Sequence, residues 1–284
     1  MNRIFTYWVD KPESNIPAYI QLCMQTWYEN IPDLEVIIIN HENMYEWIAP
    51  TFDKRAFNQL SLPMQSDVIS FAVLQKHSGI YMDADTIVTG DIFKKFKELE
   101  HNKSKLYFFG DKDGLHIAVM ASFMPYHPAL SACVERENAL LLELLVNGTL
   151  KINWDTFGNA VVDRMRQNEV LNSFVSIIDK SETGAILESC YLSSGNPYID
   201  YLSLYFTDQL NFDELMSKIK FGLVMLHNSW TPDDFKAAGL VDALYSDLTV
   251  SKLLRFALGK KFLEGINSHA TNSAKEDIRT FEYI

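Results

Sequence analysis

The sequence predicts an α/β fold in which a mostly parallel, doubly wound sheet carries helices on both faces. The first observation is an alternation of β-rich runs with segments of helical periodicity in the first third of the chain. The second is the run E-V-I-I-I-N at residues 35–40, which is apolar without alternation, as in a parallel strand buried on both faces. The third is the composition, because 284 residues with 48% hydrophobic and 22% charged residues are typical of a globular protein with a substantial core.

The N-terminal elements follow in the order strand, helix, strand, helix, strand. Strands are expected at residues 4–9, 35–40 and 80–83, and helices at residues 19–29 and 64–77. Gly79 ends the second helix. Because ligands bind beyond the carboxyl ends of the strands in such sheets, the residues after the strand at 80–83 are candidate site residues.

The later elements are strands at residues 106–110, 117–122 and 221–227 and helices at residues 128–147 and 159–167. The chain shows no internal repeat, low-complexity block or Pro/Gly/Ser-rich linker. We therefore expect one main domain over residues 1–235, followed by a helical extension and tail over residues 236–284.

Charge and cysteine content exclude several classes of protein. The net charge of −12 argues against nucleic-acid binding, and an anionic substrate would need a cation to bind. The three widely spaced cysteines match no metal pattern and no disulfide framework, which favours a cytoplasmic protein. The N-terminus lacks the apolar core of a signal peptide, and no apolar run approaches the roughly 20 residues that span a bilayer.

The segment G-I-Y-M-D-A-D at residues 79–85 places two carboxylates one residue apart at the end of an apolar run. If the strand continued, Asp83 and Asp85 would point to the same face and repel each other unless a cation lay between them. Carboxylates in this arrangement suit Mn²⁺ or Mg²⁺, which prefer oxygen ligands. The pattern alone leaves open a solvated loop or a helix cap.

The longer segment S-D-V-I-S-F-A-V-L-Q-K-H-S-G-I-Y-M-D-A-D resembles the signature of the D-x-D sugar transferases. It is most similar to glycosyltransferase family 32, of the capsular-polysaccharide type, and the similarity extends over residues 3–230 through segments such as C-M-Q-T-W and L-H-N-S-W. The matching positions are Ser66, Asp67, Leu74, Gly79, Tyr81, Asp83 and Asp85.

The resemblance implies a GT-A fold and a hexosyltransferase. The donor would be a UDP-sugar, UDP-galactose or UDP-glucose, used with Mn²⁺ or Mg²⁺ and with retention of configuration. The acceptor would be an oligosaccharide or lipid-linked glycan in bacterial surface or capsular polysaccharide synthesis. A metal-bound donor diphosphate would also solve the problem of binding an anion to an acidic protein.

The resemblance also assigns roles to residues around the motif. Asp83 would reach the ribose and the metal, with Ala84 beside it, and Asp85 would bind the metal. Asp67 would contact the donor sugar or ribose. His227 would be the third metal ligand, although a histidine at a strand end is the alternative. Ser229 is a second metal candidate, and with Trp230 it is suited to diphosphate contact.

Two other segments carry weaker candidates. Thr6, Tyr7 and Trp8 end the first strand and would frame a uracil ring, or else belong to an ordinary aromatic core. Asp155, in W-D-T-F-G-N, would orient the acceptor hydroxyl or stabilise an oxocarbenium-like transition state. The alternative for Asp155 is the N-cap of the following helix.

The chain departs from the family pattern at two positions. Ser70 stands where the family usually has an arginine near the donor sugar, and Ser78 replaces the first of two glycines, which is mild unless its backbone needs a positive φ. The loss of the arginine keeps a second hypothesis open, a nucleotide-sugar or carbohydrate binding protein without turnover.

The C-terminal stretch S-K-L-L-R-F-A-L-G-K-K-F-L-E-G is basic and amphipathic. Such a stretch rests on an anionic membrane surface or packs its apolar side on the domain as an ordinary helix. The first alternative predicts a cytoplasmic protein in peripheral contact with the inner face of the plasma membrane.

Overall fold

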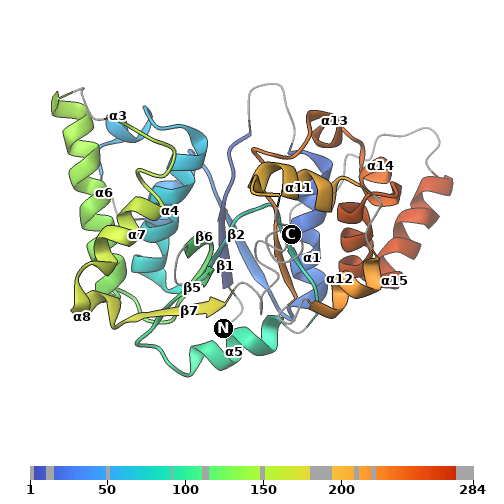
Figure 1. The fold of residues 1–284 in the computed structure, drawn as a ribbon, viewed down its shortest axis with the longest axis horizontal. Helices are drawn as coiled ribbons and strands as arrows, with labels where there is room; N and C mark the ends of the chain where they lie inside the picture. The colour runs from blue at the N-terminus through green and yellow to red at the C-terminus, as the bar shows by residue number, and fades with distance from the viewer. Residues whose placement is uncertain are drawn as a thin grey trace.

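The computed structural model describes residues 3–10, 16–48, 52–90, 92–110, 115–147, 151–179, 194–207, 211–218 and 222–272. Its largest sheet has six strands in the order β2-β1-β3-β6-β5-β7 (Figure 1). They are β1 (Arg3–Tyr7), β2 (Glu35–Ile39), β3 (Gly79–Met82), β5 (Leu106–Gly110), β6 (Leu115–Ser122) and β7 (Val175–Asp179).

The sheet is mostly parallel. Strands β2, β1 and β3 are parallel neighbours, and β5 is parallel to β7. Among the six described strands of this sheet, only β6 runs in the opposite direction, because it pairs antiparallel with both β3 and β5. The predicted mixed α/β fold class is therefore confirmed, with one reversed strand in the middle of the sheet.

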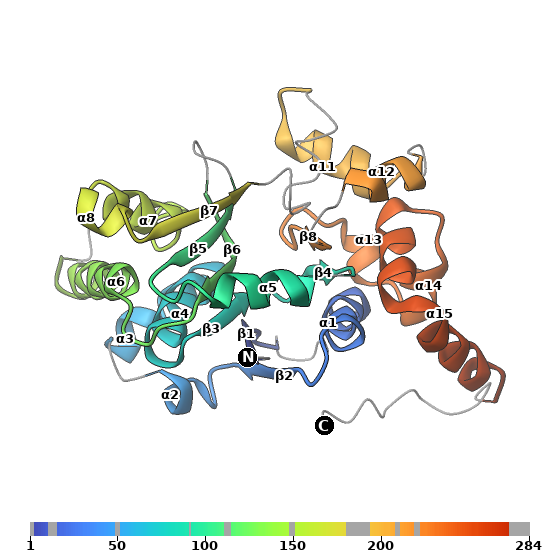
Figure 2. The same ribbon diagram turned by 90° about the horizontal axis from the view of Figure 1, so that it is seen from below.

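Helices cover both faces of this sheet (Figure 2). On one face, α4 (Leu62–His77), α6 (Pro128–Asn147) and α7 (Asn159–Arg166) contribute to a core that includes Phe5 and Tyr81. On the other face, α1 (Ala18–Asn30), α5 (Ile92–Glu100) and α15 (Thr249–Asn272) contribute to a core around Ile4 and Met82. Alternate residues of β1 and β3 thus enter different cores, as the pleat requires.

The described part of the chain contains further short helices. They are α2 (Met44–Trp47), α3 (Lys54–Phe57), α8 (Glu169–Asn172), α11 (Pro197–Tyr205), α12 (Phe212–Lys218), α13 (Asp233–Lys236) and α14 (Leu240–Tyr245). The predicted bounds of the long helices hold to within two residues, and α6 has the predicted bounds. The predicted domain boundary at residue 235 falls inside α13, and residues 273–284 of the predicted tail lie outside the described residues.

A second sheet pairs β4 (Thr86–Val88) antiparallel with β8 (Leu223–Met225), with Thr86 opposite Met225. The late strand was predicted at 221–227, but the structure gives only three residues to it; Phe221 lies outside the described residues. Trp27 of α1 donates its indole N–H to the carbonyl of Thr86 at 2.7 Å, so the pair is tied to the main domain.

Helix α15 packs against α1 and β4. Leu253, Leu254 and Leu258 are buried there, while Phe256 is 54% exposed. The burial of these leucines favours the ordinary packed helix over a membrane-bound stretch, and membrane contact stays a prediction. Within the described ranges, no helix combines the length and the apolar composition needed to cross a bilayer.

We expect Gly222→Ala to weaken the pairing of β4 with β8. A β-carbon at Gly222, whose φ is 63°, would lie 1.2 Å from the carbonyl oxygen of Thr89. Gly90 is the matched control, because its φ is 69° and a β-carbon there meets nothing within 4 Å. Urea unfolding should show a loss of about 1 kcal/mol for Gly90→Ala and at least about 2 kcal/mol more for Gly222→Ala. Equal losses would mean that the contact with Thr89 is not a constraint.

Candidate active site

The two carboxylates of the D-A-D motif lie in a turn and not in a strand. Strand β3 ends at Met82, and the Asp83 N–H still donates to the Ala118 carbonyl at 2.7 Å. The Thr86 N–H then donates to the Asp83 carbonyl at 3.0 Å, which closes the turn before β4. The expectation that strand alternation aligns Asp83 with Asp85 is therefore wrong.

Asp85 lies where β4 and β8 meet. The backbone N–H of Asn228 donates to its carboxylate at 2.7 Å, and the N–H of Leu226 donates to its carbonyl at 3.3 Å. The side chain is 8% exposed, and this burial raises the pKa of the Asp85 carboxyl to about 6 even though the charge of His227 lowers it. The antiparallel register thus brings Asp85 next to the predicted ligand His227.

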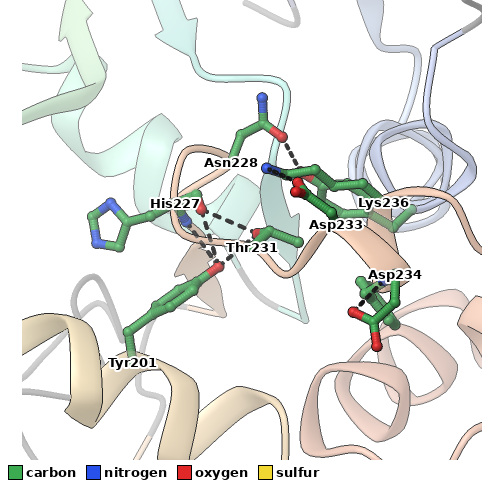
Figure 3. A network of polar contacts seen from close by, with 9 residues as sticks. Tyr201, His227, Asn228, Thr231, Asp233, Asp234 and Lys236 are labelled. Atoms are coloured by element: carbon green, nitrogen blue, oxygen red, sulfur yellow. Dashed lines mark hydrogen bonds and ion pairs between the residues drawn. The ribbon is translucent and has the colours of Figure 1, made fainter.

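The turn that carries His227 is held by Tyr201 of α11 (Figure 3). The backbone N–H of His227 donates to the Tyr201 hydroxyl at 3.1 Å, and that hydroxyl lies 2.9 Å from the Thr231 hydroxyl. The His227 ring points away from Thr231 in this view and packs on Trp230, with ring centroids 4.5 Å apart. Tyr19 donates a hydrogen bond to the side chain of Asn228.

Asp83 lies on the side of the turn that faces α4. Its carboxylate accepts from the Ser66 hydroxyl at 3.5 Å, and Ser66 is also 2.6 Å from the Tyr81 hydroxyl. Burial, then the charges of Asp85 and Asp67, raise the pKa of the Asp83 carboxyl well above its usual range. The structure therefore brings Asp67 and Asp85 close enough for their charges to act on Asp83.

Asp67 on α4 contacts the D-T-F-G turn. A β-carbon at Gly158 would lie 2.7 Å from Asp67 Oδ2 and 2.7 Å from Ile117 Cδ1, so a larger residue there would displace these side chains. Burial raises the pKa of the Asp67 carboxyl well above its usual range. Gly158 is the N-cap of α7 and no side chain caps the helix, so the alternative that Asp155 is the N-cap is wrong.

The two departures from the family pattern have different consequences. Ser70 is 1% exposed, and its hydroxyl donates to the Asp67 carbonyl of the same helix at 2.7 Å. Ser78 has φ 57°, a left-handed value that favours glycine. The replacement of glycine by Ser78 is therefore not mild, because the backbone at this position has a positive φ.

The first strand presents only part of its predicted contact surface. Thr6 is fully buried, and Tyr7 is 6% exposed with its hydroxyl donating to Gln65 at 2.6 Å. Trp8 is half-buried and donates its indole N–H to Asp10 at 3.0 Å. Stacking on a base therefore stays a prediction for Trp8, whereas Tyr7 belongs to the core.

The remaining predicted residues lie on the two turns. Ala84 is 4% exposed, Trp230 is half-buried and Ser229 is exposed. In the part of the chain that the structure describes, no group of three or more His, Cys, Asp or Glu side chains is arranged to hold a metal ion alone. A cation here would need ligands from its substrate in addition to the carboxylates.

Sequence reasoning set His116 aside and missed Glu137. His116 enters the site because β6 is reversed; its ring centroid lies 5.5 Å from that of His227. Burial, with a smaller effect of His227, lowers the pKa of His116 to about 3. Glu137 interrupts the apolar stripe of α6 and is 1% exposed, a signal that was present in the sequence.

The fold and the site define an α/β protein with coupled carboxylates where its parallel strands end, the usual ligand position in such sheets. Residues 1–123 match a family described as capsular polysaccharide synthesis protein. This match confirms the resemblance carried by the motifs for that part of the chain. A comparison with curated proteins finds no match.

Three solved glycosyltransferases have a similar overall structure. PaToxG glycosyltransferase is 16% identical over 60% of this chain and 69% of its own, with a TM-score of 0.42. Apo GlyE from Streptococcus pneumoniae TIGR4 is 14% identical over 95% of this chain and 64% of its own (TM-score 0.48). The galactosyltransferase LgtC, with donor and acceptor sugar analogues, is 9% identical over 94% and 95% (TM-score 0.41). Because all three TM-scores lie below 0.5, no functional conclusion is based on these similarities.

We expect Asp85→Asn to flatten the pH dependence of stability in metal-free protein. The pKa of Asp85 is about 6 in the folded chain and near 3.9 when unfolded, so its contribution to stability is present at low pH and is lost as the pH rises through about 6. About 2 pKa units correspond to about 3 kcal/mol. Urea unfolding at pH 4 and pH 7.5 measures this loss in the wild type, in Asp85→Asn and in the exposed control Asp233→Asn. Equal losses in all three would contradict the burial of the Asp85 charge.

Proposed function

We propose that this chain is a metal-dependent glycosyltransferase that moves a hexose from a UDP-sugar to a glycan acceptor in capsular or surface polysaccharide synthesis. The donor is UDP-galactose or UDP-glucose, and the reaction proceeds with retention of configuration. The single observation that supports this proposal best is the meeting of Asp83 and Asp85 with the turn at His227 and Asn228. The family match over residues 1–123 supports the polysaccharide context.

The donor set fits a hard divalent cation. Asp67, Asp83 and Asp85 are carboxylates whose pKa values are raised by burial, and no lysine or arginine among the described residues lowers them. Buried carboxylates without a basic partner are the oxygen ligands that Mn²⁺ and Mg²⁺ prefer. Asp83 and Asp85, with His227 beside them, would hold the ion and leave other positions to phosphate oxygens and water. When bound, the ion would stabilise negative charge on the leaving diphosphate.

The chain's own groups then orient the two substrates. The turn of Asn228, Ser229 and Trp230 begins at the N–H that bonds Asp85, and the exposed side chains of Asn228 and Ser229 are suited to contact the diphosphate. Asp67 accepts hydrogen bonds from the donor sugar, because its carboxylate is fixed between α4 and Gly158. Asp155 lies three residues before Gly158, which is next to Asp67. It would orient the acceptor hydroxyl.

The second candidate is a nucleotide-sugar or carbohydrate binding protein without turnover. The observation that favours it is Ser70, whose hydroxyl is bonded within its own helix and supplies no cation near the donor sugar. This candidate predicts binding of UDP with metal but no release of sugar. The two functions differ in turnover and share the same ligands.

The first test measures UDP release from UDP-galactose, UDP-glucose and their N-acetyl derivatives, with Mn²⁺ or with EDTA. We expect slow hydrolysis of one donor that requires Mn²⁺ and falls at least about 100-fold in Asp85→Ala, because a ligand of the cation that stabilises the leaving diphosphate is lost. Glu98→Ala, on the exposed side of α5, is the matched control and should keep full activity. Undiminished hydrolysis in EDTA would overturn the metal dependence, and binding of UDP without any hydrolysis would favour the binding protein.

Metal binding has a readout that does not depend on turnover. At a Mn²⁺ concentration 100 times its Kd, the wild type should gain about 2.7 kcal/mol of stability, because the ion binds only the folded state. Thermal unfolding with and without Mn²⁺ should show this gain in the wild type and in Glu98→Ala, and should not show it in Asp83→Asn/Asp85→Asn. A gain of the same size in the double variant would assign the ion to a different site.

A further inference from the structure

The proposed function leaves unused the side chain of His116, near the start of β6. The Nδ1 atom of this imidazole is buried and has no hydrogen-bond partner among the described residues. Its ring faces the site, with its centroid 5.5 Å from that of His227. A buried polar atom without a partner lowers stability, so a ligand that supplies the missing hydrogen bond is a functional reason for this histidine.

The reversal of β6 brings its first residues to the ligand side of the sheet. The last pair that β6 forms with β3 is Val119 opposite Met82. The Ala118 carbonyl then accepts the N–H of Asp83, the first residue of the D-A-D turn. His116 lies two residues further along from Ala118, and therefore beyond the end of β3. This is the region in which ligands bind to α/β sheets.

An irregularity of β6 decides which face of the sheet His116 occupies. Phe108 of β5 pairs with Met120, but the next residue, Phe109, pairs with His116, so three residues of β6 stand between these two pairs and none of β5 does. Residues 118 and 119 of β6 accordingly enter the same core, whereas neighbours alternate in a regular strand. In an unbroken strand His116 would share the α4 side of the sheet with Met120. The break turns it instead toward the turn after β8.

Two segments with proposed substrate roles flank the start of β6. On the His116 side is the turn after β8, where Asn228 and Ser229 are suited to the diphosphate. On the other side, Ile117 contacts the D-T-F-G turn, because a β-carbon at Gly158 would lie 2.7 Å from Ile117 Cδ1. A donor whose diphosphate binds at the first turn and whose sugar reaches the second passes the start of β6. The part of the donor nearest to His116 is therefore the sugar.

A sugar hydroxyl suits the imidazole better than a phosphate or a cation does. A hydroxyl donates to a bare ring nitrogen and accepts from an N–H, so it serves either tautomer of His116. A phosphate oxygen accepts only, and a cation requires a bare nitrogen. Within the described ranges, moreover, no three His, Cys, Asp or Glu side chains are arranged to hold a metal ion, so His116 completes no such set.

We propose that His116 is a specificity-determining residue whose Nδ1 atom forms a hydrogen bond with a hydroxyl of the transferred hexose. The bond accounts for the buried nitrogen that has no partner among the described residues. This inference rests on the proposed function, because it takes the hexose of a UDP-sugar as the ligand. It adds to the site a residue of β6 that recognises the sugar and does not contact UDP.

The experiment compares His116→Phe, His116→Asn and the control His101→Phe. His116→Phe keeps a ring of similar size and removes Nδ1, whereas His116→Asn keeps a polar atom near the Nδ1 position. His101 is an exposed histidine just after α5, so its replacement should leave every measurement unchanged. Calorimetry with Mn²⁺ measures the affinities for UDP, UDP-galactose and UDP-glucose, and thermal unfolding gives Tm.

In His116→Phe we expect the affinity for the preferred UDP-sugar to fall about tenfold, as the loss of one hydrogen bond predicts, while the affinity for UDP stays within about twofold. The Tm of this variant should not fall, because the substitution removes a buried nitrogen without a partner. His116→Asn should retain the affinity for the UDP-sugar within about threefold, because its amide restores the bond.

Deoxy donors test the bond from the side of the ligand. Analogues of the preferred UDP-sugar that lack the hydroxyl at carbon 2, 3, 4 or 6 are titrated into the wild type and into His116→Phe. One analogue should bind the wild type about tenfold more weakly than the parent donor and should bind His116→Phe as well as the parent does, because the two changes remove the same bond. Losses that add for all four analogues would overturn the proposal.

Failure of the inference and failure of the proposed function give different results. A parallel loss of affinity for UDP in His116→Phe would assign His116 to the diphosphate, and loss of the gain in stability with Mn²⁺ would assign it to the metal ion. A lower Tm with unchanged affinities would assign it to the fold. Each of these results overturns the sugar contact while UDP release by the wild type stands. A wild type that binds no UDP-sugar overturns the proposed function and the inference together.

Discussion

The antiparallel pairing of β4 with β8 is the contact on which the site depends. It places Asn228 beside Asp85, although 143 residues separate them, and supplies the backbone N–H that the buried carboxylate accepts. The pairing is itself secured from both sides, by Trp27 on Thr86 and by Tyr201 under the turn at His227. Without this pairing, the buried Asp85 carboxylate would lack the Asn228 N–H as a donor, which would destabilise the fold.

The same constraint explains why the carboxylates remain together. Asp85 accepts a hydrogen bond from a backbone N–H, and Asp83 accepts one from the hydroxyl of Ser66. The Asp67 carboxylate has no such bond to the described residues, and its charge raises the pKa of Asp83. Such carboxylates resist ionisation in the free protein, and a divalent cation bound to them would replace protons as the neutralising charge. Under the proposed function, the protonation state of these carboxylates and the binding of the cation would therefore depend on each other.

The parallel half of the fold could be predicted because local patterns determine it. Buried parallel strands read as unbroken apolar runs, and a D-A-D after such a run marks a strand end. What failed were features set by tertiary contacts. The turn at Asp83 depends on the Ala118 carbonyl, and the reversed strand that carries His116 depends on its pairing with β3 and β5, all distant in sequence. The N-cap alternative for Asp155 failed because helix α7 begins after Gly158, three residues further along the chain, and no side chain caps it.

Glu137 shows where sequence and structure give complementary information. Along α6 the apolar spacing predicts a buried face, and a glutamate in that face contradicts the pattern. Conflicts of this kind concentrate at functional positions, because selection retains a destabilising group only where it contributes elsewhere. The structure buries this glutamate in α6, which packs on the helix that carries Asp67, and neither of its carboxylate oxygens has a hydrogen-bond partner among the described residues.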